Sequence, residues 1–373
     1  MFTKENTKQI KGVAIILMLA HHLFAFPDKV PFGVSLSTDI IISEKELVQL
    51  IGEFCKICVS IYMFMGGYGL YKKAVKQGDE DVIQNSLAKN ISRLYMAYWK
   101  IFLIFVPIAI LFFNNQGAYC VEESICFRYA NVTLKDLLMN FVGLSYTLNS
   151  EWWFFGYYLF ALFLGWVFIE LFRNKRNLYI EICTVIVWSI FLTRVFPILP
   201  FKEGMDLLWS NIWYKYICLG SEYSILFFVG IIYAKYKIFE GWEKNVQVLK
   251  RIEAILAALF VIGLLVYTRV FFTDVAFDIV VVPAFIFACT VIIGKNKWLA
   301  KLFGYLGEHS TNIWLVHSFY CFYFAPVVRI VYASNNAIVA LLVLLALSLV
   351  TSILLNAFWK LIGTGRMKLF YRA

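Results

Sequence analysis

Residues 337–361 read AIVALLVLLALSLVTSILLNAFWKL, a run of 25 positions in which Lys360 is the one charged side chain. A helix of about 20 apolar residues crosses the hydrocarbon core of a bilayer, which is about 30 Å thick. Longer runs than this are rare in the interior of soluble domains. The stretch therefore predicts a transmembrane helix, and the rest of the chain is interpreted outward from it.

Nine further stretches of similar character precede this one, and the composition of the whole chain agrees with them. Hydrophobic residues make up 61% of the 373 positions and charged residues 16%, against about 25% in soluble proteins. This balance excludes a water-soluble enzyme, and 18% aromatic residues exclude a disordered chain. We expect an all-α polytopic membrane protein with about ten transmembrane helices, the other nine at about 12–26, 47–70, 94–113, 151–172, 178–196, 217–234, 252–272, 275–293 and 303–332.

The excess of basic residues behind the net charge of +10 indicates how these helices are oriented in the membrane. The two ends of the chain and the even-numbered connections hold 23 of the 34 Lys and Arg residues. Because basic residues gather on the cytoplasmic side, both termini are predicted to be cytoplasmic. Ten spans leave little chain for a separate soluble domain, so residues 1–373 are expected to form a single transmembrane domain with no nucleic-acid partner.

The third connection, residues 114–150, is the longest of those that the charge pattern places outside. It contains a short helix-like stretch at residues 133–148. Cys120 and Cys126 both fall in it, and an oxidising compartment would allow them to form a disulfide. A bridged and an unbridged pair both remain open.

Ionisable side chains at membrane depth are costly, by about 2.5 to 3.5 kcal/mol at the centre of a span, so each one is a candidate functional group. Several have a structural explanation. Arg269 is close enough to a span end to reach the interface, and Glu53 and Lys56 have the spacing of a helical ion pair. Cys55 and Cys58 have no neighbouring His or acidic cluster, which favours buried core residues over a metal site. No metal ion is expected.

The first helix pairs a basic residue with a histidine. Lys11 and His22 are 11 positions apart, which in an α-helix is three turns plus about 20° and about 16 Å along the axis. Both side chains therefore project from one face, whereas His21 is about 80° away from it. With Lys11 at the cytoplasmic edge, His22 is expected near the middle of the membrane, where a neutral imidazole can act as a base.

This segment, Lys11-Gly12-Val13-Ala14-Ile15-Ile16-Leu17-Met18-Leu19-Ala20-His21-His22, resembles the first-helix signature of the membrane-bound acyltransferase-3 family. These bacterial polytopic proteins O-acylate extracytoplasmic sugars from a cytoplasmic acyl-CoA. His22 stands in the family's catalytic place, and Lys11 stands where Arg is usual. Four later segments are similar to family motifs in the same order: Phe64-Met65-Gly66-Gly67-Tyr68, Lys89-Asn90-Ile91-Ser92-Arg93, Glu151-Trp152-Trp153-Phe154 and residues 306–317 up to His317. Asn90 departs from the family by replacing an Arg.

The resemblance implies an integral-membrane O-acyltransferase of the bacterial plasma membrane. It would move an acyl group, expected to be acetyl, from acyl-CoA to a hydroxyl of an extracytoplasmic glycan or lipid-linked sugar. Two roles are open for His317: it could assist His22, or it could form a hydrogen bond between helices. The residues at the start of the fourth span could contact the sugar or cap the helix. The expected site residues are His22 and His317 for catalysis, Lys11, Lys89 and Arg93 for the phosphates of the donor, and Asn149, Glu151 and Trp153 for the acceptor.

Two other function classes fit a polytopic membrane protein. A transporter or flippase of a lipid-linked glycan or metabolite commonly shows two related halves, and the first and last five spans share no repeated motif. A membrane sensor domain would show no turnover at all. Incorporation of a labelled acyl group into an outward-facing glycan would separate the three classes.

Overall fold

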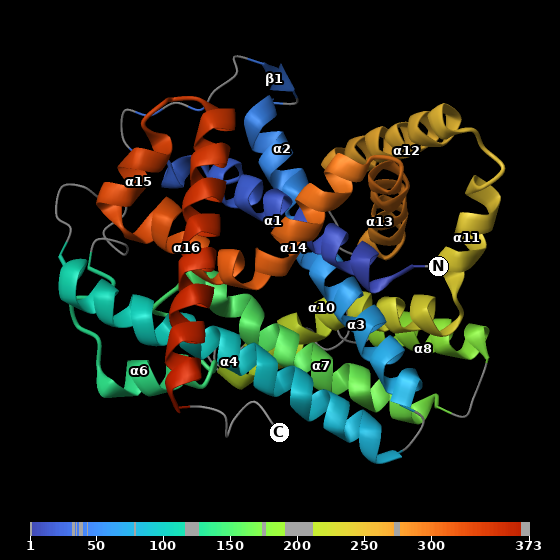
Figure 1. The fold of residues 1–373 in the computed structure, drawn as a ribbon, viewed down its shortest axis with the longest axis horizontal. Helices are drawn as coiled ribbons and strands as arrows, with labels where there is room; N and C mark the ends of the chain where they lie inside the picture. The colour runs from blue at the N-terminus through green and yellow to red at the C-terminus, as the bar shows by residue number, and fades with distance from the viewer. Residues whose placement is uncertain are drawn as a thin grey trace, which may run out of the picture. The chain divides into compact units, whose positions relative to one another are not determined.

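The structure is a computed structural model, and it describes residues 2–31, 34, 36, 40–42, 44–77, 80–115, 127–173, 177–190, 212–271 and 277–366 (Figure 1). Within these ranges the side chains of residues 76–86, 212–222, 271 and 363–366 are not described. Cys120 and Cys126, the possible disulfide pair, lie outside the described residues.

Helices dominate the described part of the chain, and the two short strands β1 (Ile41–Ile42) and β2 (Lys45–Glu46) pair antiparallel. The helices are α1 (Lys4–Phe24), η1 (Pro27–Lys29), α2 (Leu47–Cys55), α3 (Ile57–Gln77), α4 (Glu80–Phe112), α6 (Leu134–Phe141), η3 (Ser150–Trp152), α7 (Trp153–Leu171), α8 (Leu178–Ile190), α10 (Ile212–Lys235), α11 (Ile238–Val246), α12 (Arg251–Phe271), α13 (Asp278–Gly294), α14 (Lys297–Ser318), η7 (Phe319–Tyr323), α15 (Ala325–Tyr332) and α16 (Ala337–Arg366). The sequence-based expectation of an all-α membrane protein is confirmed at this level.

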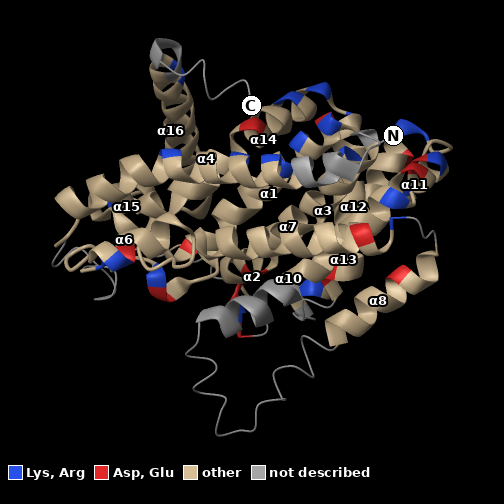
Figure 2. Ribbon diagram, turned by 90° about the horizontal axis from the view of Figure 1, so that it is seen from below, with Lys and Arg blue, Asp and Glu red and all other residues tan. Residues whose placement is uncertain are grey.

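Each of the ten predicted spans overlaps one or more helices of the described residues, but their lengths differ. Five described helical stretches are long and apolar enough to cross a membrane, and a sixth is the bent pair of residues 297–323 and 325–332. Figure 2 shows the helices almost entirely uncharged, with acidic and basic residues mostly near helix ends and connections. The membrane character is thus supported, whereas ten spans and cytoplasmic termini remain predictions.

The bend in the ninth predicted span has a local cause. The helix α14 continues as the π-helical turn η7 and stops at Phe324, and α15 then leaves at 91°. Pro326 lies in the first turn of α15. Because proline has no backbone N–H and its ring clashes with the carbonyl four residues earlier, α14 cannot extend through this position.

The chain forms two compact units, which are described separately. The first unit comprises Met1–Ile10, Ile57–Ser92 and Trp153–Lys301. Its helices α3 and α10 pack at backbone distance, because a Cβ atom at Gly67 would overlap the carbonyl oxygen of Phe227. Gly67 belongs to the second motif of the sequence analysis, and its place is therefore explained by helix packing.

Buried ion pairs connect helices of the first unit. Arg269 of α12 donates to both carboxylate oxygens of Asp278 at 2.8 and 3.0 Å, and Ser60 of α3 donates to the same carboxylate. Arg269 and Asp278 are both buried, so the prediction that Arg269 reaches the interface is wrong. Asp278, the partner of Arg269, begins α13 nine residues later. The ion pair lowers the free-energy cost of burying either charge alone.

The second unit comprises Lys11–Lys56, Arg93–Trp152 and Leu302–Ala373. Here α1 and α14 pack at backbone distance, because a Cβ atom at Gly12 would overlap the carbonyl oxygen of Phe303. Glu53 pairs with Lys45 at 2.7 Å through the turn that precedes α2. The predicted pair of Glu53 with Lys56 is wrong, because Glu53 pairs with Lys45 instead and Lys56 forms no ion pair among the described residues.

The short helix predicted in the third connection is present as α6, although it ends earlier than expected. Thr133 and Asp136 form a capping box, in which each side chain accepts a hydrogen bond from the backbone N–H of the other. This arrangement satisfies two donors that a helix start leaves without partners. The helix ends at Phe141, and Gly143 follows with a positive φ of 77°.

Candidate functional site

Two histidines meet in the second unit, one from each of the helices that Gly12 brings together. The ring centroids of His22 on α1 and His317 on α14 are 4.8 Å apart. His317 is completely buried, and His22 lies in the last turn of α1, two residues before its end. The structure therefore brings together the two residues that the sequence analysis expects to be catalytic.

Hydrogen bonds fix the protonation of one of these rings. His317 Nδ1 lies 2.6 Å from the carbonyl oxygen of Trp314, which can only accept, so Nδ1 carries the proton. Its Nε2 is then a lone-pair acceptor, and it is buried without a hydrogen-bond partner among the described residues. Within the same part of the chain, His22 Nδ1 is also buried without a partner. Ring nitrogens that are left unpaired in this way can take up a proton or bind a ligand.

The neighbouring histidine has a different environment. His21 Nδ1 donates to the backbone carbonyl of Gly52 at 2.8 Å, which attaches α1 to α2. A Cβ atom at Gly52 would overlap the backbone of Phe24 and Ala25, so the two helices touch at this point. His21 thus holds two helices together, whereas His22 faces His317.

The predicted acceptor residues Asn149 and Glu151 lie on the connection that packs against the end of α14. Asn149 and Ser318 exchange hydrogen bonds at 2.7 and 3.1 Å, and both are completely buried. The indole N–H of Trp152 donates to the carbonyl of Leu315 at 3.0 Å. Ser318 follows His317 directly, so these contacts fix the backbone that carries the histidine.

Glu151 is buried and accepts a hydrogen bond of 2.5 Å from the hydroxyl of Tyr323. The same hydroxyl accepts the backbone N–H of Ser150 at 3.1 Å. Tyr323 ends the π-helical turn η7, and π-helical turns occur frequently at functional sites. Sequence reasoning missed Ser318 and Tyr323, although both lie within six residues of His317.

Trp153, the third predicted acceptor residue, belongs to the first unit. It begins α7 and packs its ring against Tyr157 and Tyr223, at centroid distances of 5.3 Å each. The structure therefore shows Trp153 in an aromatic cluster of its own unit. A contact with an acceptor remains a prediction.

The three predicted donor residues are dispersed along two helices. Lys89 and Arg93 are exposed on α4, and Lys11 is half-buried in the first half of α1. Asn90, the residue that departs from the family pattern, accepts a hydrogen bond of 2.7 Å from the ammonium of Lys73. Lys73 thereby places a cation beside the position where the family has Arg, a contact that the linear sequence does not reveal.

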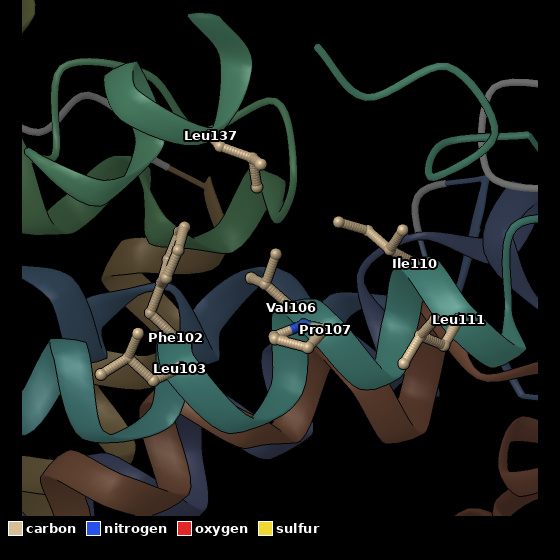
Figure 3. A pocket seen from close by; sticks show the side chains of 7 residues that line it. All are labelled: Phe102, Leu103, Val106, Pro107, Ile110, Leu111 and Leu137. Atoms are coloured by element: carbon tan, nitrogen blue, oxygen red, sulfur yellow. The ribbon is translucent and has the colours of Figure 1, made fainter. Parts of the chain in front are cut away.

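Other features of the described chain do not contribute to this site. A pocket of about 310 Å³ lies between α4 and α6, and all seven side chains that line it are apolar (Figure 3). Cys55 and Cys58 are buried, as expected for core residues. Among the described residues, no group of three or more His, Cys, Asp or Glu side chains could hold a metal ion.

Comparison with known protein families gives a match that extends over most of the chain. Residues 8–357 match a family whose description is an acyltransferase domain. The match begins before Lys11 and ends within α16, so it includes both histidines. Comparisons with curated proteins and with solved structures give no match.

Proposed function

The chain belongs to the acyltransferase-3 family of membrane acyltransferases, and on this basis we propose that it transfers an acyl group from cytoplasmic acyl-CoA to a hydroxyl of an extracytoplasmic glycan or lipid-linked sugar. The observation that carries the proposal is the pair His22 and His317, whose rings lie 4.8 Å apart, each with a nitrogen that has no hydrogen-bond partner in the described part of the chain. Both termini are proposed to be cytoplasmic, with the protein in a bacterial plasma membrane and acetyl as the acyl group.

In the proposed reaction His22 takes the proton of the acceptor hydroxyl. The hydroxyl oxygen then attacks the thioester carbonyl, so that a C–O bond forms and the C–S bond to coenzyme A breaks. The proton passes from the imidazole to the departing thiolate. A base of this type contributes about 10²- to 10⁴-fold to the rate.

His317 is proposed to assist His22. Because its Nδ1–H is held by the Trp314 carbonyl, the free lone pair on Nε2 can accept a hydrogen bond from an N–H of the neighbouring imidazole. That bond would orient His22 and stabilise it when it is protonated. Of the two roles that the sequence left open for His317, its position 4.8 Å from His22 favours assistance.

Donor binding is proposed for Lys11, Lys89 and Arg93. Cations of this kind neutralise phosphate oxygens, and Arg can do so through two parallel hydrogen bonds. The rise of about 16 Å from Lys11 to His22 would let a pantetheine arm carry the thioester from the cytoplasmic surface to the histidines.

Acyl transfer in membranes that contain the full-length protein tests the proposal. Labelled acetyl-CoA should label a glycan or lipid-linked sugar in the wild type. His22→Ala should lower this rate by at least about 100-fold, while His21→Ala, the matched control, should keep most of it. His22→Ala should remain folded, which the midpoint of thermal unfolding of the same sample checks. Activity retained in His22→Ala would exclude it as the base, and uptake of a solute without any labelled product would favour the transporter.

A further inference from the structure

Two cations lie over adjacent aromatic rings at the end of the histidine site. The ammonium of Lys29 is 4.9 Å from the centroid of Phe322 and equally far from that of Phe26. The guanidinium of Arg128 is 4.7 Å from the centroid of Tyr323. Phe322 and Tyr323 are consecutive residues of η7, so two segments far apart in sequence bring their charges to one turn.

The rings that hold Lys29 contact a proposed catalytic residue, and the ring that holds Arg128 contacts a proposed acceptor residue. The ring of Phe322 packs edge-on against His22 at 5.8 Å, and Phe26 stacks on His22 at 6.2 Å. On the other side of the turn, Tyr323 donates to Glu151. Lys29 comes after the end of α1 that is opposite to Lys11, and Arg128 lies in the third connection, so both fall on the side predicted to be extracytoplasmic.

Neither cation has a carboxylate partner among the described residues. Elsewhere in the described chain, Lys45, Lys72, Lys235 and Arg269 each pair with a Glu or Asp within 4.0 Å. Arg128 donates one N–H to the carbonyl of Thr147 at 2.7 Å, and its Nε is buried with no hydrogen-bond partner from the described ranges. Half-buried cations that rest on aromatic rings and form no direct ion pair with a described residue are suited to bind an anion that arrives with a ligand.

We propose that Lys29 and Arg128 bind a phosphate group of the acceptor and so present its hydroxyl to the histidine pair. The inference rests on the proposed function and names the class of acceptor, a phosphate-bearing glycan or lipid-linked sugar. Phosphate fits because a guanidinium donates to two of its oxygens while an ammonium acts as a point charge. The phosphate has two possible sources, the pyrophosphate of a lipid carrier or a phosphate within the glycan.

The first arm of the test measures binding without turnover. Inorganic pyrophosphate is added to the purified full-length protein with saturating coenzyme A, which occupies the donor site. The midpoint of thermal unfolding should rise more than in sodium chloride of equal ionic strength. The double variant Lys29→Gln/Arg128→Gln should lose this difference. Lys135→Gln, which removes an exposed cation of α6, should keep it.

The second arm examines acyl transfer from labelled acetyl-CoA in detergent-treated membranes. Lys29→Gln and Arg128→Gln should each lower the rate at limiting acceptor by about tenfold, with unchanged affinity for acyl-CoA. The labelled product should bind to an anion-exchange column. Retention that disappears after mild acid hydrolysis would assign the phosphate to a lipid carrier, and retention that persists would assign it to the glycan.

The two arms separate failure of the inference from failure of the proposed function. A neutral labelled product, together with equal pyrophosphate effects in the wild type and the double variant, would overturn the phosphate site and leave the acyltransferase standing. Pyrophosphate stabilisation that depends on Lys29 and Arg128, without any labelled product, would support the site and overturn the proposed function. Variants that only lose thermal stability would show that the two cations merely anchor their segments to η7.

Discussion

The hydroxyl of Tyr323 donates a hydrogen bond of 2.5 Å to Glu151, although 172 positions separate the two residues, and both side chains are buried. Hydrogen bonds to a charged group contribute about 1.5 to 3 kcal/mol, because an unpaired buried carboxylate is poorly solvated. Tyr323→Phe should therefore lower the free energy of unfolding by about this amount in mixed micelles.

A double-mutant cycle distinguishes this bond from a general packing effect. If the bond carries the energy, Tyr323→Phe and Glu151→Gln should be less destabilising together than the sum of the two single changes. Tyr305→Phe removes a hydroxyl from an exposed side chain of α14 and should change little. Strictly additive effects of the two variants would contradict a direct Tyr323–Glu151 interaction.

Protonation of Asp136 should weaken the start of α6. Hydrogen bonds from the Thr133 side chain and backbone lower the pKa of Asp136 below its usual value. A carboxyl whose pKa is lower in the folded state stabilises it above the unfolded pKa, and this contribution is lost as the pH falls through the folded value. Amide hydrogen exchange in α6, corrected for the intrinsic rate, should therefore become faster on acidification. Asp136→Asn should remove this pH dependence, and an identical dependence in both proteins would contradict the capping box.

The donor site makes a prediction that depends on the type of cation. Arg93→Ala should weaken the binding of acyl-CoA more than Lys89→Ala does, because a guanidinium binds phosphate through two parallel hydrogen bonds and an ammonium through one point charge. Calorimetric titration of the purified variants measures this difference. Lys4→Ala, an exposed cation at the start of α1, serves as the control. Unchanged affinity in Arg93→Ala would remove Arg93 from the donor site.

The sequence predicts the helices of this protein better than it predicts the contacts between them. Apolar runs require helices in a membrane, because every backbone group has to be hydrogen-bonded inside its own segment. Arg269 and Asp278 show the limit of this reasoning. The distance of Arg269 from a predicted span end suggests contact with water, whereas the fold buries it in an ion pair with Asp278. Such pairing depends on how α12 and α13 pack, which periodicity does not encode.

The candidate site, too, could be predicted from the sequence only in part. The 11-residue spacing from Lys11 predicts His22 rather than His21 as the residue at the site, and the contact of His22 with His317 agrees with that choice. Tyr323 could not be placed in the same way. It reaches Glu151 from a π-helical turn, in which the extra residue per turn changes the direction of every later side chain.

The direction of the helices in the membrane can be tested with single cysteines in a cysteine-free background. Asp28→Cys should react with a membrane-impermeant maleimide added outside intact cells, because the residue after α1 is predicted to be extracytoplasmic. Ser92→Cys, also exposed, should react only after the membrane is opened. The reverse pattern would invert the topology, and with it the assignment of the donor and acceptor sides.

Gly12 should control the distance between the two catalytic candidates. A Cβ atom at this position would overlap the carbonyl oxygen of Phe303, which is part of the backbone and cannot rotate away. Gly12→Ala should therefore move α1 away from α14, the helices that carry His22 and His317. We expect the rate of acyl transfer to fall by at least about tenfold, since a displacement of 1 Å can cost a catalytic site as much as 100-fold.

The rate is measured per folded protein, at a temperature well below the unfolding midpoint, so that loss of stability alone does not lower it. Gly263→Ala in α12 is the matched control, because no atom lies within 4 Å of its added Cβ, and it should keep the wild-type rate. Wild-type activity in Gly12→Ala would show that transfer does not require the close packing of these two helices.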